Sequence, residues 1–246
     1  VVCSDKTGTL TQNRMTVVKV CTNSEKDVKN LSDEEKTLLK YFAICCDASI
    51  SCVDGETKRI GDPTELALLD VCINNNIIYN DVKKVLDLPF DSERKLMTTV
   101  IEYKEKYLSI TKGAPDVVFK ITANSEILSQ MIEVNKNMAD EALRVLALCV
   151  KEYDYLTKEA ELEKDINLLG LVGMIDPARE EVKESIKIAK KAHIKTVMIT
   201  GDHIITAKAI AKNLGIMNDN DKAITSEELD KLSDEYLEKH INEYSV

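Results

Sequence analysis

Residues 1–11 read VVCSDKTGTLT, and this stretch decides the fold. The short apolar run at residues 1–4 predicts a buried β-strand, and the carboxylate of Asp5 follows it directly. In an open α/β sheet, chemistry collects at the carboxyl ends of the strands. A carboxylate there, beside the free N–H groups of a loop, can attack a phosphoryl group that the loop holds. The alternative, for one Asp-x-x-Gly alone, is a strand that ends in a turn with Asp5 as its cap.

A second junction of strand and helix carries matching residues. Residues 195–199 predict a strand and His203 to Leu214 predict a helix, with Thr200, Gly201 and Asp202 between them. A threonine hydroxyl, a glycine N–H and a helix N-terminus together form a phosphate site. Taken alone, Asp202 is better explained as an N-cap. Paired with the first motif, the phosphate site is favoured, because neighbouring parallel strands end at the same crevice.

Six motifs, in one order along the chain, resemble those of the P-type ATPases, the ion and lipid pumps. They are DKTGTLT at 5–11, LPFDSERKLM at 88–97, KGAPD at 112–116, ALRVLA at 142–147, MIDPAR at 174–179 and MITGD at 198–202. The chain looks most similar to the calcium pumps of bacterial membranes and of the endoplasmic or sarcoplasmic reticulum. The resemblance implies a truncated parallel sheet of the haloacid-dehalogenase type with an inserted α+β nucleotide-binding domain.

The order of expected elements gives the domain boundaries. Strand, helix, strand and helix alternate from Leu168 to Leu214, which is the rhythm of a parallel sheet, and the middle of the chain lacks it. We therefore expect the phosphorylation domain to comprise residues 1–12, its first strand and loop, and residues 169–246, its continuation, incomplete at the C-terminus. Residues 13–168 are expected to form the inserted nucleotide-binding domain.

The resemblance assigns roles to the residues around Asp5. Asp5 is the expected nucleophile, which becomes an aspartyl phosphate, while Lys6 and Thr200 help to hold the phosphoryl group. Mg²⁺ is expected between the Asp5 carboxylate, the Thr7 carbonyl and the phosphoryl oxygens. Hydrolytic relatives of this fold place an acid/base aspartate two residues after the nucleophile. Thr7 occupies that position here, so we expect water to attack the acyl phosphate slowly.

The resemblance also implies a pocket for ATP in the insert. Phe90 matches the aromatic residue on which adenine stacks, although a phenylalanine is more often a core residue. Lys112 and Gly113 match the pocket motif, in which lysine supplies a compact cation and glycine admits a ligand close to the backbone. Relatives often carry an arginine at the position of Ser92.

The cation that reaches the ATP phosphates is therefore open, and Arg94 and Lys95 are the two candidates.

Four further residues have both a structural and a functional explanation. Glu65 matches an adenine contact and equally fits the third helical position of a capping box headed by Asp62. Arg144 matches an arginine near the nucleotide phosphates, and a charge in a strand that looks buried needs a partner. Asp176 and Arg179 belong to a segment that in the family forms a hinge and approaches the nucleotide. Asp176 can equally cap a helix.

Composition excludes several classes of protein. The 246 residues carry a net charge of −10, which disfavours nucleic acid and anionic membrane surfaces as partners. The seven cysteines form no C-x-x-C pair, which argues against a disulfide framework or a structural zinc site. No apolar run approaches the roughly 18 residues of a membrane span. With these classes excluded, the resemblance implies a monomeric cytoplasmic fragment, on the cytoplasmic face of a membrane when full length.

The family's Gly-Asp-Gly-x-Asn-Asp loop does not occur in the sequence. We therefore expect a fragment that binds ATP but phosphorylates itself poorly, and whose partners in the whole pump are its own transmembrane and actuator domains. Alternatives to a calcium pump are another cation pump (for sodium and potassium, protons or magnesium), a soluble phosphatase of the same fold, or a nucleotide-binding module without catalysis.

Overall fold

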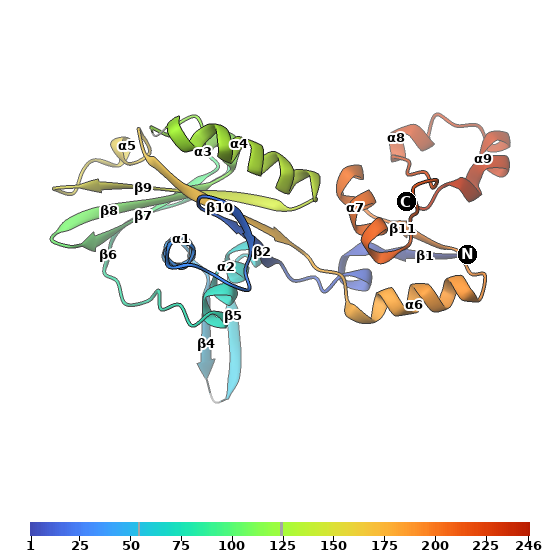
Figure 1. Ribbon diagram of the computed structural model, residues 1–246, viewed down its shortest axis with the longest axis horizontal. Coiled ribbons are helices and arrows are strands. Elements are labelled where there is room, and N and C mark those ends of the chain that lie inside the picture. Colours follow the sequence, from blue (N-terminus) through green and yellow to red (C-terminus); the bar gives the residue numbers. More distant parts are fainter. Residues whose placement is uncertain (54, 124) are drawn as a thin grey trace. The chain divides into compact units, whose positions relative to one another are not determined.

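The computed structural model describes residues 1–53, 55–123 and 125–246. The chain divides into two compact units (Figure 1). The first comprises Val1–Arg14, Asp140–Ala142 and Asp176–Val246, and the second comprises Met15–Ala139 and Leu143–Ile175. Each unit is described separately below.

The second unit is built on a seven-stranded sheet in which every neighbouring pair is antiparallel, in the order β3-β2-β10-β9-β8-β7-β6. The strands are β2 (Thr16–Cys21), β3 (Glu25–Asp27), β6 (Lys84–Asp91), β7 (Leu96–Tyr103), β8 (Lys106–Gly113), β9 (Arg144–Tyr153) and β10 (Asn167–Ile175). A separate hairpin pairs β4 (Ser49–Val53) with β5 (Glu56–Ile60). The helices are α1 (Asp33–Ile44), α2 (Pro63–Asn74), α3 (Pro115–Val118), α4 (Ser125–Asp140) and α5 (Glu159–Leu162).

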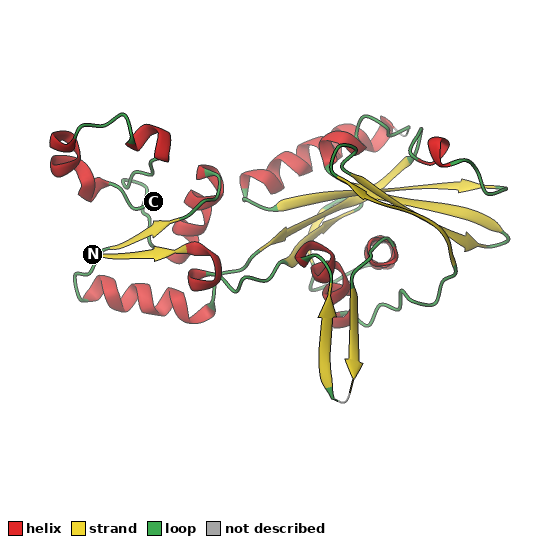
Figure 2. Ribbon diagram, turned by 180° about the vertical axis from the view of Figure 1, so that it is seen from behind, coloured by secondary structure: helices red, strands yellow, loops and turns green. Residues whose placement is uncertain are grey.

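Helices cover both faces of this sheet (Figure 2). Side chains alternate between the faces of a strand, so Leu148 of β9 packs with α1 and α2, while Ala147 and Cys149 pack with α3 and α4. The alternation creates two apolar cores, one on each side of the sheet. Phe42 of α1 is fully buried in the first core, and Met131 of α4 in the second.

Local sequence signals explain where several elements begin and turn. Ser32 and Glu35 form a capping box at the start of α1. The hairpin of β7 and β8 turns at Lys104 and Glu105, whose φ angles of 48° and 63° suit a tight turn between twisted strands. The polar interval of residues 22–30 contains the short strand β3.

The first unit contains two parallel strands, β1 (Val2–Asp5) and β11 (Thr196–Ile199), with Asp5 opposite Ile199. A loop, η1 (Lys6–Leu10), follows β1, and Thr7 and Gly8 within it have non-helical backbone angles. The helices are α6 (Glu180–Lys191), α7 (Ile204–Leu214), α8 (Ser226–Leu229), α9 (Asp234–His240) and η2 (Ile241–Glu243). Its core joins Leu10, Ile186 and Met198 to the inner face of α7. Gly215, at φ 76°, ends α7 in the left-handed conformation that the sequence predicts.

One expectation about the sheets was wrong. Residues 168–175 belong to β10, which lies between β2 and β9 in the antiparallel sheet, and do not extend the parallel pair. An apolar run of this length suits a buried strand in either kind of sheet, so periodicity does not identify its neighbours. Within the described residues, β1 and β11 are the only named strands that pair in parallel. The fold is thus mixed α/β with a mostly antiparallel sheet, and the units divide after Arg14 and Ile175, with Asp140–Ala142 assigned to the first unit.

None of the helices in the described part of the chain combines the length and apolar character that crossing a membrane requires.

Candidate functional site

The second unit contains a cavity of about 750 Å³. It lies among the start of α2, the turn between β6 and β7, the end of β8 and the start of β9. Its lining residues are Asp47, Ala48, Gly61, Asp62, Thr64, Glu65, Phe90, Ser92, Lys95, Lys112, Gly113, Ala114, Arg144, Val145 and Leu146. The cavity thus brings together five of the residues expected to bind nucleotide in the insert: Glu65, Phe90, Lys112, Gly113 and Arg144.

Phe90 is an apolar side chain displayed at this cavity. It is 61% exposed on β6, whereas Phe42 is fully buried. A phenylalanine is more often a core residue, and the exposure of this ring leaves it accessible to a ligand in the cavity. The ring can stack on an aromatic base.

Lys112 forms the charged floor of the cavity. Its buried ammonium donates to Glu65 Oε1 at 2.6 Å and to Cys46 Sγ at 3.2 Å. Burial alone lowers the pKa of the Lys112 ammonium, whereas its contacts with Cys46, Cys45 and Glu65 raise it above its usual value, and at neutral pH the ion pair with Glu65 is the contact that keeps the ammonium charged. Lys112 therefore stays charged at neutral pH and can attract an anion or a ring nitrogen.

Glu65 does not form the capping box that the sequence allows. Asp62 alone caps α2, since its carboxylate accepts a hydrogen bond from Thr64 N at 2.7 Å. The Glu65 carboxylate instead accepts from the backbone of Asp47 at 3.0 Å and of Ala48 at 2.9 Å. Glu65 thereby joins α2, β8 and the loop after α1 around the cavity.

Arg144 is exposed at the first position of β9, and not inside a buried strand as expected. Its Nη1 donates to Thr64 Oγ1 at 3.0 Å, which holds the guanidinium at the cavity edge.

Arg94 is not among the residues that line the cavity, and its contact with the nucleotide stays a prediction. Its guanidinium binds Glu163 and the carbonyl of Pro89. The neighbouring Lys95 lines the cavity in its place. The sequence offered both cations and contained no signal for the partner, because Glu163 lies 69 residues further along the chain.

Two glycines allow the chain to pack closely at the cavity. A Cβ on Gly113 would lie 2.5 Å from the carbonyl oxygen of Lys95, so this glycine serves the contact between β8 and the β6–β7 turn. A Cβ on Gly61, whose φ is 129°, would lie 2.5 Å from Cβ of Ala48. Sequence reasoning missed Gly61 and Ala48, although the glycine directly before the cap of α2 was a usable signal.

The first unit brings the two expected phosphate loops together. Asp5 ends β1 beside Ile199 of β11, and Lys6 pairs with Asp202 across the loops at 2.6 Å. Thr200 Oγ1 accepts from Asp202 N at 3.1 Å. Asp202 is not the N-cap of α7, since His203 takes that position.

The Asp5 carboxylate is exposed, and it has no hydrogen bond or ion pair with any described residue. Gly201 lies in the loop between Thr200 and Asp202 and has open space where a side chain would be. A free carboxylate beside a charged lysine and an open loop is a suitable acceptor for a phosphoryl group.

Asp176 does not cap a helix, because α6 starts later, at Glu180. Its carboxylate accepts from Thr11 Oγ1 at 2.5 Å and from Arg14 N at 3.1 Å. The guanidinium of Arg179 donates to the carbonyls of Thr11 at 3.1 Å and of Gly8 at 3.0 Å. These two residues brace the loop after Asp5, and their approach to a nucleotide stays a prediction.

A magnesium ion fits the oxygen donors at this loop. Mg²⁺ binds through one or two carboxylates together with substrate phosphates, and it keeps several waters. The free Asp5 carboxylate and the backbone carbonyl of Thr7 supply that kind of donor. Among the described residues, no group of three or more His, Cys, Asp or Glu side chains forms a denser metal site.

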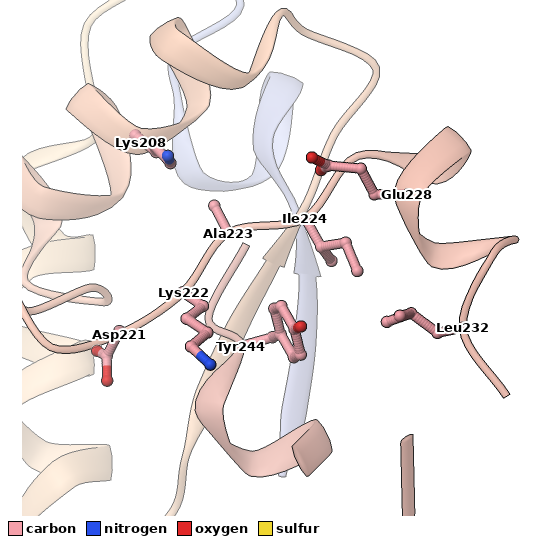
Figure 3. A pocket seen from close by; sticks show the side chains of 8 residues that line it. All are labelled: Lys208, Asp221, Lys222, Ala223, Ile224, Glu228, Leu232 and Tyr244. Carbon is pink, nitrogen blue, oxygen red and sulfur yellow. The ribbon is translucent and has the colours of Figure 1, made fainter. Parts of the chain in front are cut away.

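A second hollow, of about 380 Å³, lies in the first unit (Figure 3). Side chains from α7, α8 and the extended segments line it: Lys208, Asp221, Lys222, Ala223, Ile224, Glu228, Leu232 and Tyr244. Lys222 is already paired with Glu243 at 2.6 Å. The site residues expected from the sequence do not include any of these eight.

Comparison with known proteins gives concordant matches. The family model described as "P-type ATPase, cytoplasmic domain N" matches residues 34–181. A calcium-transporting ATPase of Listeria monocytogenes is 41% identical over 269 aligned residues, which cover 100% of this chain and 30% of that protein. Calcium-transporting ATPase 1 of Bacillus cereus is 42% identical, with 100% and 30% covered.

A probable cation-transporting P-type ATPase of Mycoplasma genitalium is 38% identical, with 100% of this chain and 27% of that protein covered. The chain therefore spans about 30% of the length of the first two of these relatives.

Proposed function

Since the chain belongs to the P-type ATPase family, whose model of the cytoplasmic domain N matches residues 34–181, we propose that it is the part of an ATP-driven calcium pump that binds ATP and accepts the phosphoryl group. The second unit is its nucleotide-binding domain, and the first unit is part of its phosphorylation domain. In the whole pump these units work on the cytoplasmic face of the membrane, with transmembrane and actuator domains as partners.

The observation that carries the nucleotide site is the exposed ring of Phe90 at a cavity whose floor is the Lys112 ammonium. Adenine stacks on the Phe90 ring, and the Lys112 ammonium contacts the adenine from the buried side of the cavity. Lys95 and Arg144, which also line the cavity, face the phosphates. Three acidic and three basic side chains line the cavity, so their formal charges cancel. The position of each cation therefore decides which end of the ligand it binds.

Phosphoryl transfer places the chemistry at Asp5. The Asp5 carboxylate oxygen attacks the γ-phosphorus in line, a new O–P bond forms, and the bond from phosphorus to the β–γ bridging oxygen breaks to release ADP. Lys6 and Thr200 hold the transferred group. Thr7 carries no carboxylate, so it cannot take a proton from water, and the acyl phosphate persists.

Asp5 and the Thr7 carbonyl would hold Mg²⁺, which would supply positive charge to offset that of the carboxylate and the phosphates.

Calcium as the transported ion rests on the relatives, two of which are named calcium-transporting ATPases. The ligands of a transported ion lie in the membrane-spanning segments of a pump, where ionisable side chains mark the ion pathway.

Isothermal titration with ATP tests the nucleotide site. Loss of base stacking costs about 1–3 kcal/mol per base, so Phe90→Ala should weaken ATP binding by about fivefold or more. Tyr155→Ala is the matched control, because this ring is 75% exposed on the same unit and does not line the cavity. Equal affinity of wild type and Phe90→Ala would contradict the site.

Labelling with γ-³²P-ATP tests the acceptor. Any label should be released by hydroxylamine, as an acyl phosphate is, and should be absent from Asp5→Asn, which keeps its ATP affinity. Label on a different residue, or label that survives in Asp5→Asn, would refute the assignment of Asp5.

A further inference from the structure

The turn between β6 and β7 places one cationic side chain at the cavity and directs the neighbouring one away from it. Lys95 lines the cavity, whereas Arg94 binds groups of the protein. The two side chains are adjacent in sequence, so their different directions depend on the conformation of the turn.

The backbone of Lys95 is in a conformation that L-residues rarely adopt, with φ at 54°. Lys95 N donates to Asp91 O at 2.7 Å, and the Asp91 carboxylate accepts from Glu93 N at 3.0 Å and Arg94 N at 2.8 Å. Such a conformation persists only where the surroundings hold it in place.

Arg94 connects the turn to a residue that lies outside it. Its Nη2 donates to Pro89 O at 2.9 Å, next to Phe90, and its Nη1 donates to Glu163. Glu163 Oε1 also accepts from the buried Thr98 Oγ1 at 2.9 Å, and the residue before it, Leu162, is fully buried. Glu163 is therefore a fixed anchor that lies outside the hairpin.

We propose that Arg94 and Glu163 are positioning residues that fix the turn at residues 91–95, so that the Lys95 ammonium faces the phosphates of the nucleotide. The inference rests on the proposed function and adds to it how the phosphate end is oriented. The planar guanidinium reaches Pro89 and Glu163 at once, which a lysine at this position cannot do.

Titration with ATP tests whether the pair acts through Lys95. Residues in one network couple, so Arg94→Ala and Glu163→Ala should each lower ATP affinity by about fivefold, and the double variant by no more. Arg94→Lys should not restore the affinity. In a Lys95→Ala background, Arg94→Ala should change the affinity by less than about twofold. A full additional loss in that background would show that Arg94 contacts the nucleotide itself, which overturns the proposal.

Lys83→Ala is the matched control, since it removes an exposed pair with Glu102 beside the same two strands at 2.6 Å. This variant should keep the wild-type ATP affinity.

Hydrogen exchange without nucleotide gives a second, independent readout. The amide of Lys95, bonded to Asp91 O, should exchange faster in Arg94→Ala and Glu163→Ala and at the wild-type rate in Lys83→Ala. Unchanged exchange in the first two variants overturns the proposal. If wild type binds no ATP, the proposed function fails, while the exchange rates still decide whether Arg94 holds the turn.

Discussion

The protonation state of a single residue depends on its burial as much as on its residue type. Cys46 lies against the Lys112 ammonium, and burial raises the pKa of its thiol to about 12. Burial likewise raises the pKa of the Cys72 and Cys149 thiols to about 12 and that of Cys21 to about 11. These thiols stay protonated at neutral pH, and alkylating reagents attack the thiolate.

Alkylation with iodoacetamide at pH 8 should therefore divide the seven cysteines of the folded chain. Cys3 and Cys52 are exposed and should react, while the five buried thiols should react only after unfolding. Peptide mass spectrometry reads each site. Modification of Cys46 at the rate of Cys52 in the folded protein would contradict the buried position at the cavity.

Local sequence motifs singled out several residues that line the cavity, but they did not indicate the long-range contacts between segments. Phe90, Lys112 and Arg144 carry local signatures, and the structure gathers them at one cavity. The pairing of Arg94 with Glu163 and that of Asp176 with Thr11 join segments far apart in the chain. No periodicity or spacing records such a contact.

At the scale of elements, the start of α1 follows from local capping chemistry. The Ser32 hydroxyl and the Glu35 carboxylate satisfy N–H groups within three residues of each other. The parallel pairing of β1 with β11 was predicted, but the partners of β10 were not, because its apolar run suits either kind of sheet.

Replacing the cap tests that local account. Ser32→Ala should lower the free energy of unfolding by about 1 kcal/mol, the usual cost of losing an N-cap. Thr37→Ala is the control on the same helix, since its exposed hydroxyl donates only to Asp33 O at 2.8 Å. It should change the stability by less than about 0.5 kcal/mol. Urea unfolding curves measure both variants, and equal stabilities would argue against the capping box.

At the scale of the molecule, the two units predict where the chain can be divided. The second unit contains all seven strands of the antiparallel sheet between Met15 and Ile175. Leu171, Val172 and Met174 of β10 are fully buried in its cores. Burial of each such side chain contributes about 1.5–3 kcal/mol. Together they supply an amount similar to the whole stability of a domain, about 5–15 kcal/mol.

A fragment of residues 15–175 should therefore unfold cooperatively, with ATP affinity near that of the whole chain. A fragment of residues 15–168 lacks most of β10 and should fail to fold. Circular dichroism during thermal unfolding distinguishes the two. Cooperative unfolding of the shorter fragment would show that β10 is not part of this core.

The central claim is that adenine lies on Phe90, and nuclear Overhauser effects between ATP and the protein test it most directly. The chain has only three phenylalanines, so selective labelling of phenylalanine gives few ring signals. The adenine H2 and H8 protons should show cross-peaks to the ring of Phe90 and none to the buried ring of Phe42. Cross-peaks that bypass Phe90 while ATP is bound would contradict the account.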